Sequence, residues 1–431
     1  MSLLWDRRTE NPADQKEEIT LARYGKKSLS LLLTLVLLLG LLTGLGMQAS
    51  AAELPAYTAD GIMTELASGA KNAAGAYSIS DAAELRALSA WVNAGNTGEG
   101  FIFFLTADID LGGEANPWTP IGQVDGNLGD LDVKAAFFGV FDGQGHSVTG
   151  LWIGGDDYTT GNGRYNACNG LFGQNFGTIM NVYAEVDVHT YRQGAAIAGV
   201  NFGTVEACAS SGSISANGGG GTRGTGGIVG SNYGSVKACW SSATVHNDYR
   251  RAGGIVGYNA KEVADMDAHG TWNTRGEDHI AAESTEFIGS VADCFFIGYA
   301  SSASQEYSGG IAATCDPECT IVNCYWLEGS SADDWGYYQE AEGATASFDG
   351  DGLITGTATK LIDALGSDAF VEGAHFPKLW WADAEGTAAV PGEEAPAEEE
   401  AAQLTIFGAP VALDALKAYE TEKTLVKSGI P

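Results

Sequence analysis

A phrase in which short apolar runs alternate with glycine and polar residues recurs along the middle of the chain. Its fullest copies read GLFGQNFGTIMNVYA (170–184), AIAGVNFGTVEACAS (196–210) and GGIVGSNYGSVKACW (226–240). Partial copies begin GGIVGYN (253–259) and GGIAATC (309–315). Self-similarity at a fixed spacing is typical of stacked structural units, so the pattern predicts a repeat architecture before it suggests an active site.

The repeat spacing and the residue types indicate which kind of unit is stacked. The glycine that aligns with the fifth residue of GGIVG is Gly173, Gly199, Gly230 and Gly257 in turn, at spacings of 26, 31 and 27 residues. This period is too short for a four-stranded propeller blade, and the phrase is too β-branched and glycine-rich for helical-pair repeats. We therefore predict an all-β fold, a right-handed parallel β-helix (solenoid), in which like strands of successive coils pair about 4.8 Å apart.

One apolar position per repeat continues beyond the clear copies. It lies nine residues after each alignment glycine, and the spacing extends in both directions. In-register stacking predicts that these residues form one core column: Leu151, Val182, Cys208, Cys239, Met266, Cys294 and Cys324. The column cysteines are one per coil without histidine companions, so we interpret them as small buried apolar residues rather than as zinc ligands.

Each full copy also carries an Asn-aromatic-Gly triplet between two apolar strands. Asparagine and glycine tolerate positive φ, which a sharp coil corner requires. The predicted corner residues are Asn175, Gly177, Asn201, Gly203, Asn232 and Gly234. The fourth copy departs from this rule, because no aromatic-Gly pair follows Asn259 and a polar stretch comes next. Residues 261–286 are either an extra coil, which the column spacing of Met266 favours, or a surface insertion.

A stack of coils has open ends, which need caps. At the N-terminal end, residues 81–95 place Leu85, Leu88, Trp91 and Val92 on one helical stripe, which predicts a capping helix. Ser80 or Asp81 can serve as its N-cap, and Gly95 as its stop. At the C-terminal end we expect residues 358–370 and 375–381 to close the last coil.

The chain begins with a targeting pattern. The apolar run 31–45 follows Arg23, Lys26 and Lys27 and precedes the small residues 49–51, as in a secretory signal peptide with an over-long N-terminus. An uncleaved membrane anchor is the alternative. The predicted organisation is a signal peptide (1–51), a lead-in (52–76), the β-helix (77–382), an acidic disordered linker (383–402) and a tail (403–431).

Charge and cysteine content restrict the partners. The 431 residues carry a net charge of −33, which argues against nucleic acid, because phosphate binding needs clustered Lys and Arg. So acidic a chain can bind calcium weakly, but residues 347–356 resemble only half of a calcium loop and are better interpreted as a turn.

Cys315 and Cys319 are the only sequence-local pair of the seven cysteines, and whether they form a disulfide stays open.

The phrases G-G-I-V-G-x-N and N-Y-G-S-V-x-x-C-W resemble the GLUG repeat of bacterial surface and secreted proteins, over about residues 166–327. The segments LTADIDLGG, WTPIG and FDGQGHSVTGL, and the ending FPKLWW, are similar to the flanks of such repeats. The resemblance implies a parallel β-helix with an adhesin-like role at the bacterial surface. The resemblance is specific for the architecture and does not indicate a particular activity.

Only one cluster invites an enzymatic interpretation. Asp108, Asp110 and Asp142 lie near His146 in predicted turns, and β-helix enzymes that cut polysaccharides use paired carboxylates as general acid and base. The same residues match the leader that precedes GLUG repeats, where Asp and Gly shape turns. We therefore favour turns and predict that the chain is not an enzyme.

A basic stripe is less expected on so acidic a chain. Arg192, Arg223 and Arg250 each lie seven residues before a repeat glycine, and Tyr191 and Tyr249 precede two of them. Stacked coils would align these residues as a ligand-binding stripe for anionic glycans, with the tyrosines as stacking platforms. The alternative is that each arginine pairs with a nearby carboxylate such as that of Asp248, or covers a corner with its stem.

These observations together predict a secreted or cell-surface protein with a structural or adhesive role, which binds an extracellular glycan or a surface protein as a monomer. We expect no cofactor, and membrane contact only through an uncleaved N-terminal segment. The first alternative is a polysaccharide lyase or glycoside hydrolase on the same scaffold. The second is a rigid spacer for a further domain, because the fold does not decide the function.

Overall fold

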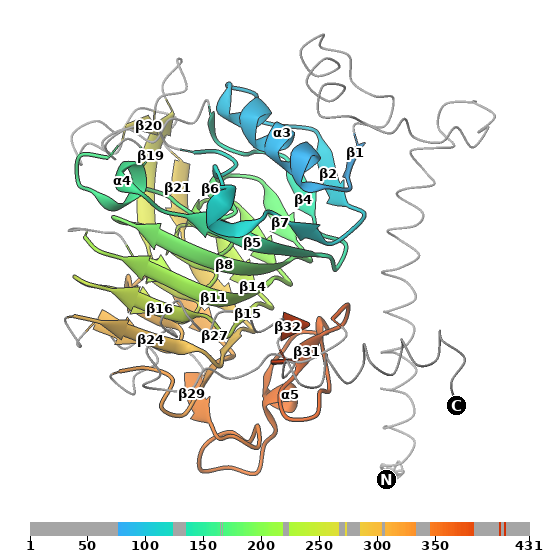
Figure 1. The fold of residues 1–431 in the computed structure, drawn as a ribbon. Helices are drawn as coiled ribbons and strands as arrows, with labels where there is room; N and C mark the ends of the chain where they lie inside the picture. The colour runs from blue at the N-terminus through green and yellow to red at the C-terminus, as the bar shows by residue number, and fades with distance from the viewer. Residues whose placement is uncertain are drawn as a thin grey trace, which may run out of the picture. The chain divides into compact units, whose positions relative to one another are not determined.

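The computed structural model describes residues 76–123, 135–163, 165, 167–218, 224–266, 272–273, 285–303, 307–332, 345–382, 405–406 and 409–410. In these residues the fold is all-β with few helices, and its large sheets are parallel, as predicted (Figure 1). This arrangement is consistent with a solenoid-like fold. The predicted signal peptide, nearly all of the lead-in, the acidic linker and most of the tail lie outside the described residues.

Three parallel sheets carry the repeats. Sheet I contains, in order, β1 (Ala76–Ile79), β2 (Ile102–Leu105), β4 (Val140–Asp142), β7 (Thr178–Met180), β10 (Thr204–Glu206), β14 (Ser235–Lys237), β22 (Ser290–Ala292) and β27 (Thr320–Val322). Sheet II contains β3 (Ile109–Asp110), β5 (Ser147–Ile153), β8 (Tyr183–Thr190), β11 (Ala209–Ala216), β15 (Trp240–Ser241), β23 (Phe295–Phe296), β28 (Cys324–Leu327) and β29 (Thr345–Phe348). In the same sheet, β16 (Thr244–Asn247) pairs with β11, and β24 (Tyr299–Ser302) pairs with β16. Sheet III contains β6 (Phe172–Asn175), β9 (Ala198–Asn201), β13 (Val229–Asn232), β18 (Val256–Asn259) and β26 (Ala312–Cys315). A smaller parallel sheet contains β12 (Thr225–Gly226), β17 (Ala252–Gly253) and β25 (Ser308–Gly309).

Each repeat contributes one strand to sheets III, I and II in turn, and like strands of successive repeats pair in register. For example, Val205 pairs with Ile179 of the preceding repeat and with Val236 of the following one. All three side chains are fully buried. The chain therefore advances by one strand spacing per repeat, and every alignment position stacks on itself.

The polar stretch after the fourth phrase is an insertion, which corrects the preference for an extra coil. Strand β14 pairs directly with β22, so no strand of residues 261–286 lies between them in sheet I. Instead, β19 (Lys261–Met266) pairs antiparallel with β21 (Thr285–Ile288) and with β20 (Trp272–Asn273). The spacing of Met266 misled because a hairpin strand happens to follow the phrase at the same distance.

The core column accordingly has five stacked rungs. Register pairs Ala209 with Tyr183 and with Trp240, and the residue before each of these belongs to the column. The five rungs are Val182, Cys208, Cys239, Cys294 and Cys324, all fully buried.

The cysteines of this column contact one another. The backbone N–H of Cys208 lies 3.4 Å from Sγ of Cys239, and that of Cys239 lies 3.4 Å from Sγ of Cys294. Burial raises the pKa of the Cys208 and Cys294 thiols. All seven cysteines, Cys315 and Cys319 included, are buried free thiols.

Two residues predicted for the column lie elsewhere. Met266 belongs to the inserted hairpin. Leu151 is buried but stands opposite Val186, because Ser147 pairs with Tyr183 and this register places His146, not Leu151, level with Val182.

The predicted corner is present, but its glycines are required for a different reason. Gly177, Gly203 and Gly234 do not have positive φ. A Cβ on any of them would instead collide with the carbonyl oxygen of the glycine one repeat earlier, which is Gly177 in the case of Gly203. Positive φ occurs at the next corner, directly before the core column, at Asn181 (55°), Ala207 (51°), Ala238 (53°), Asp293 (55°) and Asn323 (50°).

The corner asparagines form a buried ladder. Nδ2 of Asn175 donates to Oδ1 of Asn201 at 2.8 Å, Asn201 donates to Asn232 at 2.8 Å, and Asn232 donates to Asn259 at 2.9 Å. All four side chains are fully buried. Next to this ladder runs a stack of aromatic rings with centroid separations of 4.9, 4.6 and 4.7 Å, formed by Phe138, Phe176, Phe202 and Tyr233. The triplet therefore supplies two ladders as well as a corner.

The N-terminal helix α3 (Ala82–Asn93) packs on the first strands. Its N-cap is Asp81, whose side chain accepts from the Glu84 backbone N–H, and the predicted apolar stripe is buried. Arg86 and Asn93 donate to carbonyl oxygens of Pro117 and Pro120, which fastens the helix to the following loop. Two further short helices are η1 (Gly113–Ala115) and α4 (Asp156–Thr159).

The C-terminal segment was predicted to close the last repeat. In the structure it runs along the outer face of sheet II. It contains α5 (Leu361–Ala364) and the hairpin β30–β31 (Phe370–Val371, Lys378–Leu379), with a further small hairpin, β32–β33 (Thr405–Ile406, Ala409–Pro410), after it. Its apolar side chains form one cluster with Trp240, Phe295 and Tyr325 of three successive repeats. The Trp381 indole N–H donates to the carbonyl of Ala207 at 3.2 Å.

Candidate ligand-binding face

Among the described residues, the C-terminal segment packs on one half of the outer face of sheet II and does not pack on the other half, near the ends of β8, β11, β16 and β24. Because side chains alternate along a strand, every second residue of these strands points outward. We call this surface, with the turns that follow the strands, the open strip. Its residues are Asp187, His189, Ser213, Ser215, Thr244, His246, Asp248, Tyr299, Ser301 and the turn residues Tyr191, Arg192, Tyr249, Arg250 and Tyr307.

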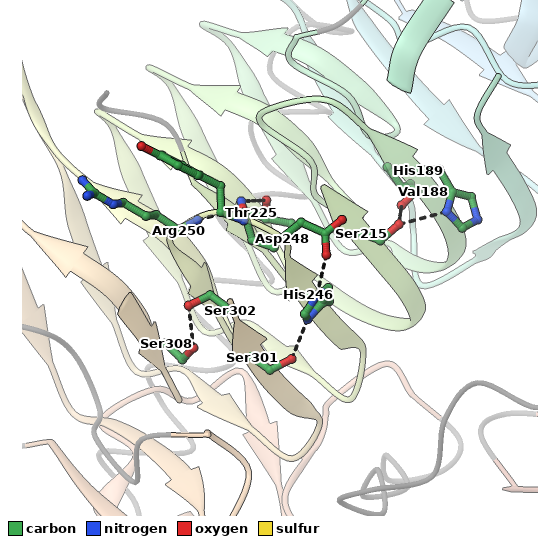
Figure 2. Close-up of polar contacts among 12 residues, drawn as sticks. Val188, His189, Ser215, Thr225, His246, Asp248, Arg250, Ser301, Ser302 and Ser308 are labelled. Carbon is green, nitrogen blue, oxygen red and sulfur yellow. Dashed lines mark hydrogen bonds and ion pairs between the residues drawn. The ribbon is translucent and has the colours of Figure 1, made fainter. Parts of the chain in front are cut away.

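Histidine and serine alternate across the last outward row of the open strip. Ser215 of β11 pairs in register with His189 of β8 and with His246 of β16, which in turn pairs with Ser301 of β24 (Figure 2). Each histidine therefore has a serine on the next strand, and the arrangement repeats after two strands, or about 9.6 Å.

Each histidine also has an aspartate partner. Nδ1 of His189 lies 2.9 Å from Oγ of Ser215, and its Nε2 lies 3.0 Å from Oδ1 of Asp187. In His246 the same atoms lie 2.8 Å from Ser301 and 3.0 Å from Asp248. The hydrogen bond that His189 donates to Asp187 raises the pKa of His189, and burial opposes this shift in part.

This Ser-His-Asp combination favours binding over acyl transfer. A hydrolase needs preorganised N–H donors for the oxyanion next to its serine. Ser215 and Ser301 lie within regular parallel ladders, where the backbone N–H groups of the strands pair with their neighbours. A row of hydroxyl, imidazole and carboxylate groups on a sheet face can instead form hydrogen bonds with an extended polar ligand.

Arginine and tyrosine side chains stack in the turns of the open strip. The Arg192 guanidinium lies 5.4 Å from the ring centroid of Tyr191. Arg250 lies between two rings, 5.2 Å from Tyr249 and 5.1 Å from Tyr307. Such cation–π contacts hold a guanidinium in place without using its N–H groups as donors. Arg250 is exposed, whereas Arg192 is half-buried and its Nε is buried without a hydrogen-bond partner in the structure.

In the described part of the chain, Arg192 and Arg250 lack the carboxylate partners that the first form of the alternative interpretation expected; the second form, in which the stem of each arginine covers a corner, stays a prediction. Within the described ranges, no carboxylate lies within ion-pair distance of Arg192 or Arg250. Asp248, the expected partner, binds His246 instead. Tyr249 is 47% exposed, which leaves its ring accessible. Arg223, the third predicted member of the stripe, lies outside the described residues.

Sequence reasoning did not identify the histidines, although a signal was present. The sequence reads HTYR at 189–192 and HNDYR at 246–250, so each histidine lies shortly before a Tyr-Arg pair. Searching outward from the arginines for titratable residues at equivalent repeat positions would have found them.

The acidic cluster near the first repeats shapes turns in the structure. Asp108 accepts the backbone N–H of Ser147 at 2.8 Å and lies 3.3 Å from His146. Asp110 accepts the N–H of Gly112 at 2.8 Å, and Asp142 accepts that of Gln144 at 2.9 Å. These carboxylates are therefore engaged with the loop backbone.

Nothing in the described part of the chain brings three or more His, Cys, Asp or Glu side chains together as metal ligands. In the predicted half calcium loop, Asp349 accepts the backbone N–H groups of Asp351 and Leu353, both at 3.0 Å, as in a turn.

Among the described residues, no helix is both long enough and apolar enough for a membrane crossing. The apolar run 31–45 lies outside the described residues.

No family model matches the chain, and no curated protein matches it. A solved structure from Bacteroides ovatus, described as a "putative immunoglobulin A1 protease", is 20% identical, covers 71% of this chain and 93% of its own, and has a TM-score of 0.45. A likeness at that TM-score carries no argument about function.

Proposed function

We propose that the protein is an exported or cell-surface protein of the GLUG-repeat type, a right-handed parallel β-helix with a structural or adhesive role, which binds an extracellular glycan through the open strip. The observation that supports this most is the contrast between the two halves of one sheet face. In the described ranges, the C-terminal segment packs on the apolar half, with Trp240, Phe295 and Tyr325, and does not pack on the polar half.

The polar half has the chemistry that sugars require. Tyrosine rings offer flat apolar surfaces for the faces of sugar rings, and the hydroxyl, imidazole and carboxylate groups can form hydrogen bonds with sugar hydroxyls. Arg192 and Arg250 add charged donors that no carboxylate of the described residues neutralises. Because these groups recur from strand to strand, they suit an extended chain of repeating units better than a compact small molecule.

A direct experiment is a glycan array with the exported protein and with the double variant Arg192→Ala/Arg250→Ala. Lys237→Ala/Lys360→Ala is the matched control, since it removes two positive charges that form exposed ion pairs away from the open strip. We expect the arginine variant to bind at least about tenfold more weakly, as the loss of a charge-assisted hydrogen bond predicts, and the control to bind as the wild type. Equal binding by all three proteins contradicts the proposal, and the absence of any glycan binding favours the spacer alternative.

One observation favours the alternative of a polysaccharide lyase or hydrolase. Burial raises the pKa of Glu185, and the charge of Asp110 adds to this effect. A carboxyl with a raised pKa is the kind of group that serves as the general acid in glycoside hydrolysis. Release of reducing ends from an array-positive glycan, lost in Glu185→Gln but kept in the exposed-site variant Glu372→Gln, would support an enzyme.

A further inference from the structure

The open strip combines equal numbers of opposite charges with two titratable rings. Arg192 and Arg250 contribute two positive charges, and Asp187 and Asp248 contribute two negative ones, so these four groups sum to zero when the histidines are neutral. When His189 and His246 are both protonated, the same groups sum to +2. An acidic ligand therefore meets two more positive charges when both rings are protonated than when both are neutral.

The geometry allows both histidines to take up a proton without rearrangement. Each ring nitrogen already faces an oxygen, from a serine hydroxyl on one side and an aspartate carboxylate on the other. A doubly protonated imidazolium can donate to both partners, because a hydroxyl and a carboxylate both accept. Both rings are partly solvent-accessible, with exposed side-chain fractions of 45% for His189 and 43% for His246.

Other charged groups near the rings are present in both protonation states, so they do not change the charge difference between those states. Glu114 of η1 faces His189, α4 beside β8 carries the exposed Asp156 and Asp157, and Glu185 lies farther along β8. For His246, Asp248 is the carboxylate within ion-pair distance in the described residues. Protonation still adds two positive charges, placed two strands apart on the same strip as the two arginines.

We infer that the open strip binds an acidic polysaccharide, and that it binds this ligand preferentially when His189 and His246 are protonated. This inference rests on the proposed glycan-binding function and adds the ligand class and its regulation. Acidic groups on the polysaccharide pair with the guanidinium groups of Arg192 and Arg250, which the tyrosine rings hold in place. Protonation of each histidine offsets the charge of its aspartate, which otherwise repels the ligand. The ligand is a chain because the cationic positions repeat along the strip.

The experiment measures binding of the full exported chain to dextran sulfate at pH 5.5 and pH 7.5. The sulfate groups keep their charge over this range, so any change in affinity reports on the protein. Uncharged dextran is the matched neutral polymer, and polygalacturonate distinguishes carboxylate from sulfate recognition. His189→Gln/His246→Gln removes the titration but keeps polar side chains, and His375→Gln is the control for an exposed histidine off the strip.

We expect the wild type and His375→Gln to bind dextran sulfate about tenfold more tightly at pH 5.5 than at pH 7.5. The double glutamine variant should bind at both pH values with the weaker affinity. His189→Arg/His246→Arg should bind at pH 7.5 as tightly as the wild type does at pH 5.5.

Two failures can be told apart. Binding that does not depend on pH, or a pH dependence that survives in the double glutamine variant, overturns this inference and leaves the proposed function standing. Absence of binding to both acidic polymers at pH 5.5 overturns the acidic ligand class. If the glycan array is also empty, the proposed function fails with it.

Discussion

The asparagine ladder gives the sharpest test of how the repeats are held together. Nδ2 of Asn201 faces three acceptors: Oδ1 of Asn232 at 2.8 Å, the carbonyl of Gly203 at 3.2 Å and that of Ser235 at 3.3 Å. On its other side, Oδ1 accepts from Asn175 at 2.8 Å. In Asn201→Asp a carboxylate oxygen of almost the same size replaces the amide nitrogen and faces those three acceptors.

The magnitude follows from burial. Asn201 is fully buried, and a buried charge without a compensating partner costs about 3–5 kcal/mol. The folded variant therefore favours the neutral form of the introduced carboxyl, which raises the pKa of that carboxyl above its unfolded value. A carboxyl whose pKa is raised on folding is tolerated below its unfolded pKa, and stability is lost as the pH rises towards its folded pKa. The loss relative to wild type should be largest at neutral pH and shrink in acid.

Urea unfolding followed by circular dichroism between pH 4.5 and pH 8 measures this difference. Asn217→Asp is the matched control, because Asn217 is exposed at the end of β11. The control should lie within about 0.5 kcal/mol of the wild type at every pH, as expected for a surface substitution. Equal stability of the two variants, or a loss in Asn201→Asp that does not change with pH, would refute the ladder as a row of buried amides that hydrogen-bond to one another.

Three further predictions follow from other contacts. Gly203→Ala should destabilise the protein by about 3 kcal/mol or more, because its Cβ collides with the carbonyl of Gly177, whereas Gly350→Ala, which meets open space, should be near neutral in thermal unfolding. Trp381→Ala should release the C-terminal segment and increase dye binding to the apolar half of sheet II, whereas the neighbouring Trp380, which is 59% exposed, can be replaced without this effect. In an NMR titration the pKa of His189 should lie above its ordinary value, and it should fall in Asp187→Asn. The stability that this pair contributes is present in acid and is lost as the pH rises through the raised pKa. Asp187→Asn should therefore destabilise the protein in acid more than at pH 8.

The repeat pattern predicted the parallel all-β architecture because the pattern and the structure express one physical requirement. Each repeat must place an apolar residue against the same residue of its neighbour, as Cys239 does between Cys208 and Cys294. Spacing alone could not tell a coil from an insertion, because Met266 satisfies the count without joining the sheet. Strand pairing depends on contacts between repeats, which a count along one repeat does not contain.

The corner shows a second limit of the sequence pattern. Gly203 was expected for its freedom to adopt positive φ, but close approach of the backbone one repeat earlier is what excludes a side chain there. Ala207 and Ala238, which do have positive φ, could not be identified because alanine carries no such preference. The conformation at those positions is imposed by the stacking of the strands on both sides.

The candidate site was half visible in the sequence. Tyr-Arg pairs at equivalent repeat positions indicated the stripe of Arg192 and Arg250. The contribution of His189 and His246 depends on the register of β8, β11 and β16, which brings a serine beside each ring. The C-terminal segment packs on the apolar half of sheet II through contacts between distant parts of the chain. One of them joins Trp381 to Ala207, which are 174 residues apart in the sequence. No local sequence pattern encodes such a contact.

The most direct measurement is hydroxyl-radical footprinting of the exported protein with and without saturating dextran sulfate at pH 5.5, read at two exposed aromatic residues. Tyr249, on the open strip, is 47% exposed, and Trp380, on the C-terminal segment, is 59% exposed. If the open strip is the binding face, oxidation of Tyr249 falls several-fold on binding and that of Trp380 does not change. Protection of Trp380 with Tyr249 unchanged would place the ligand elsewhere and contradict the account.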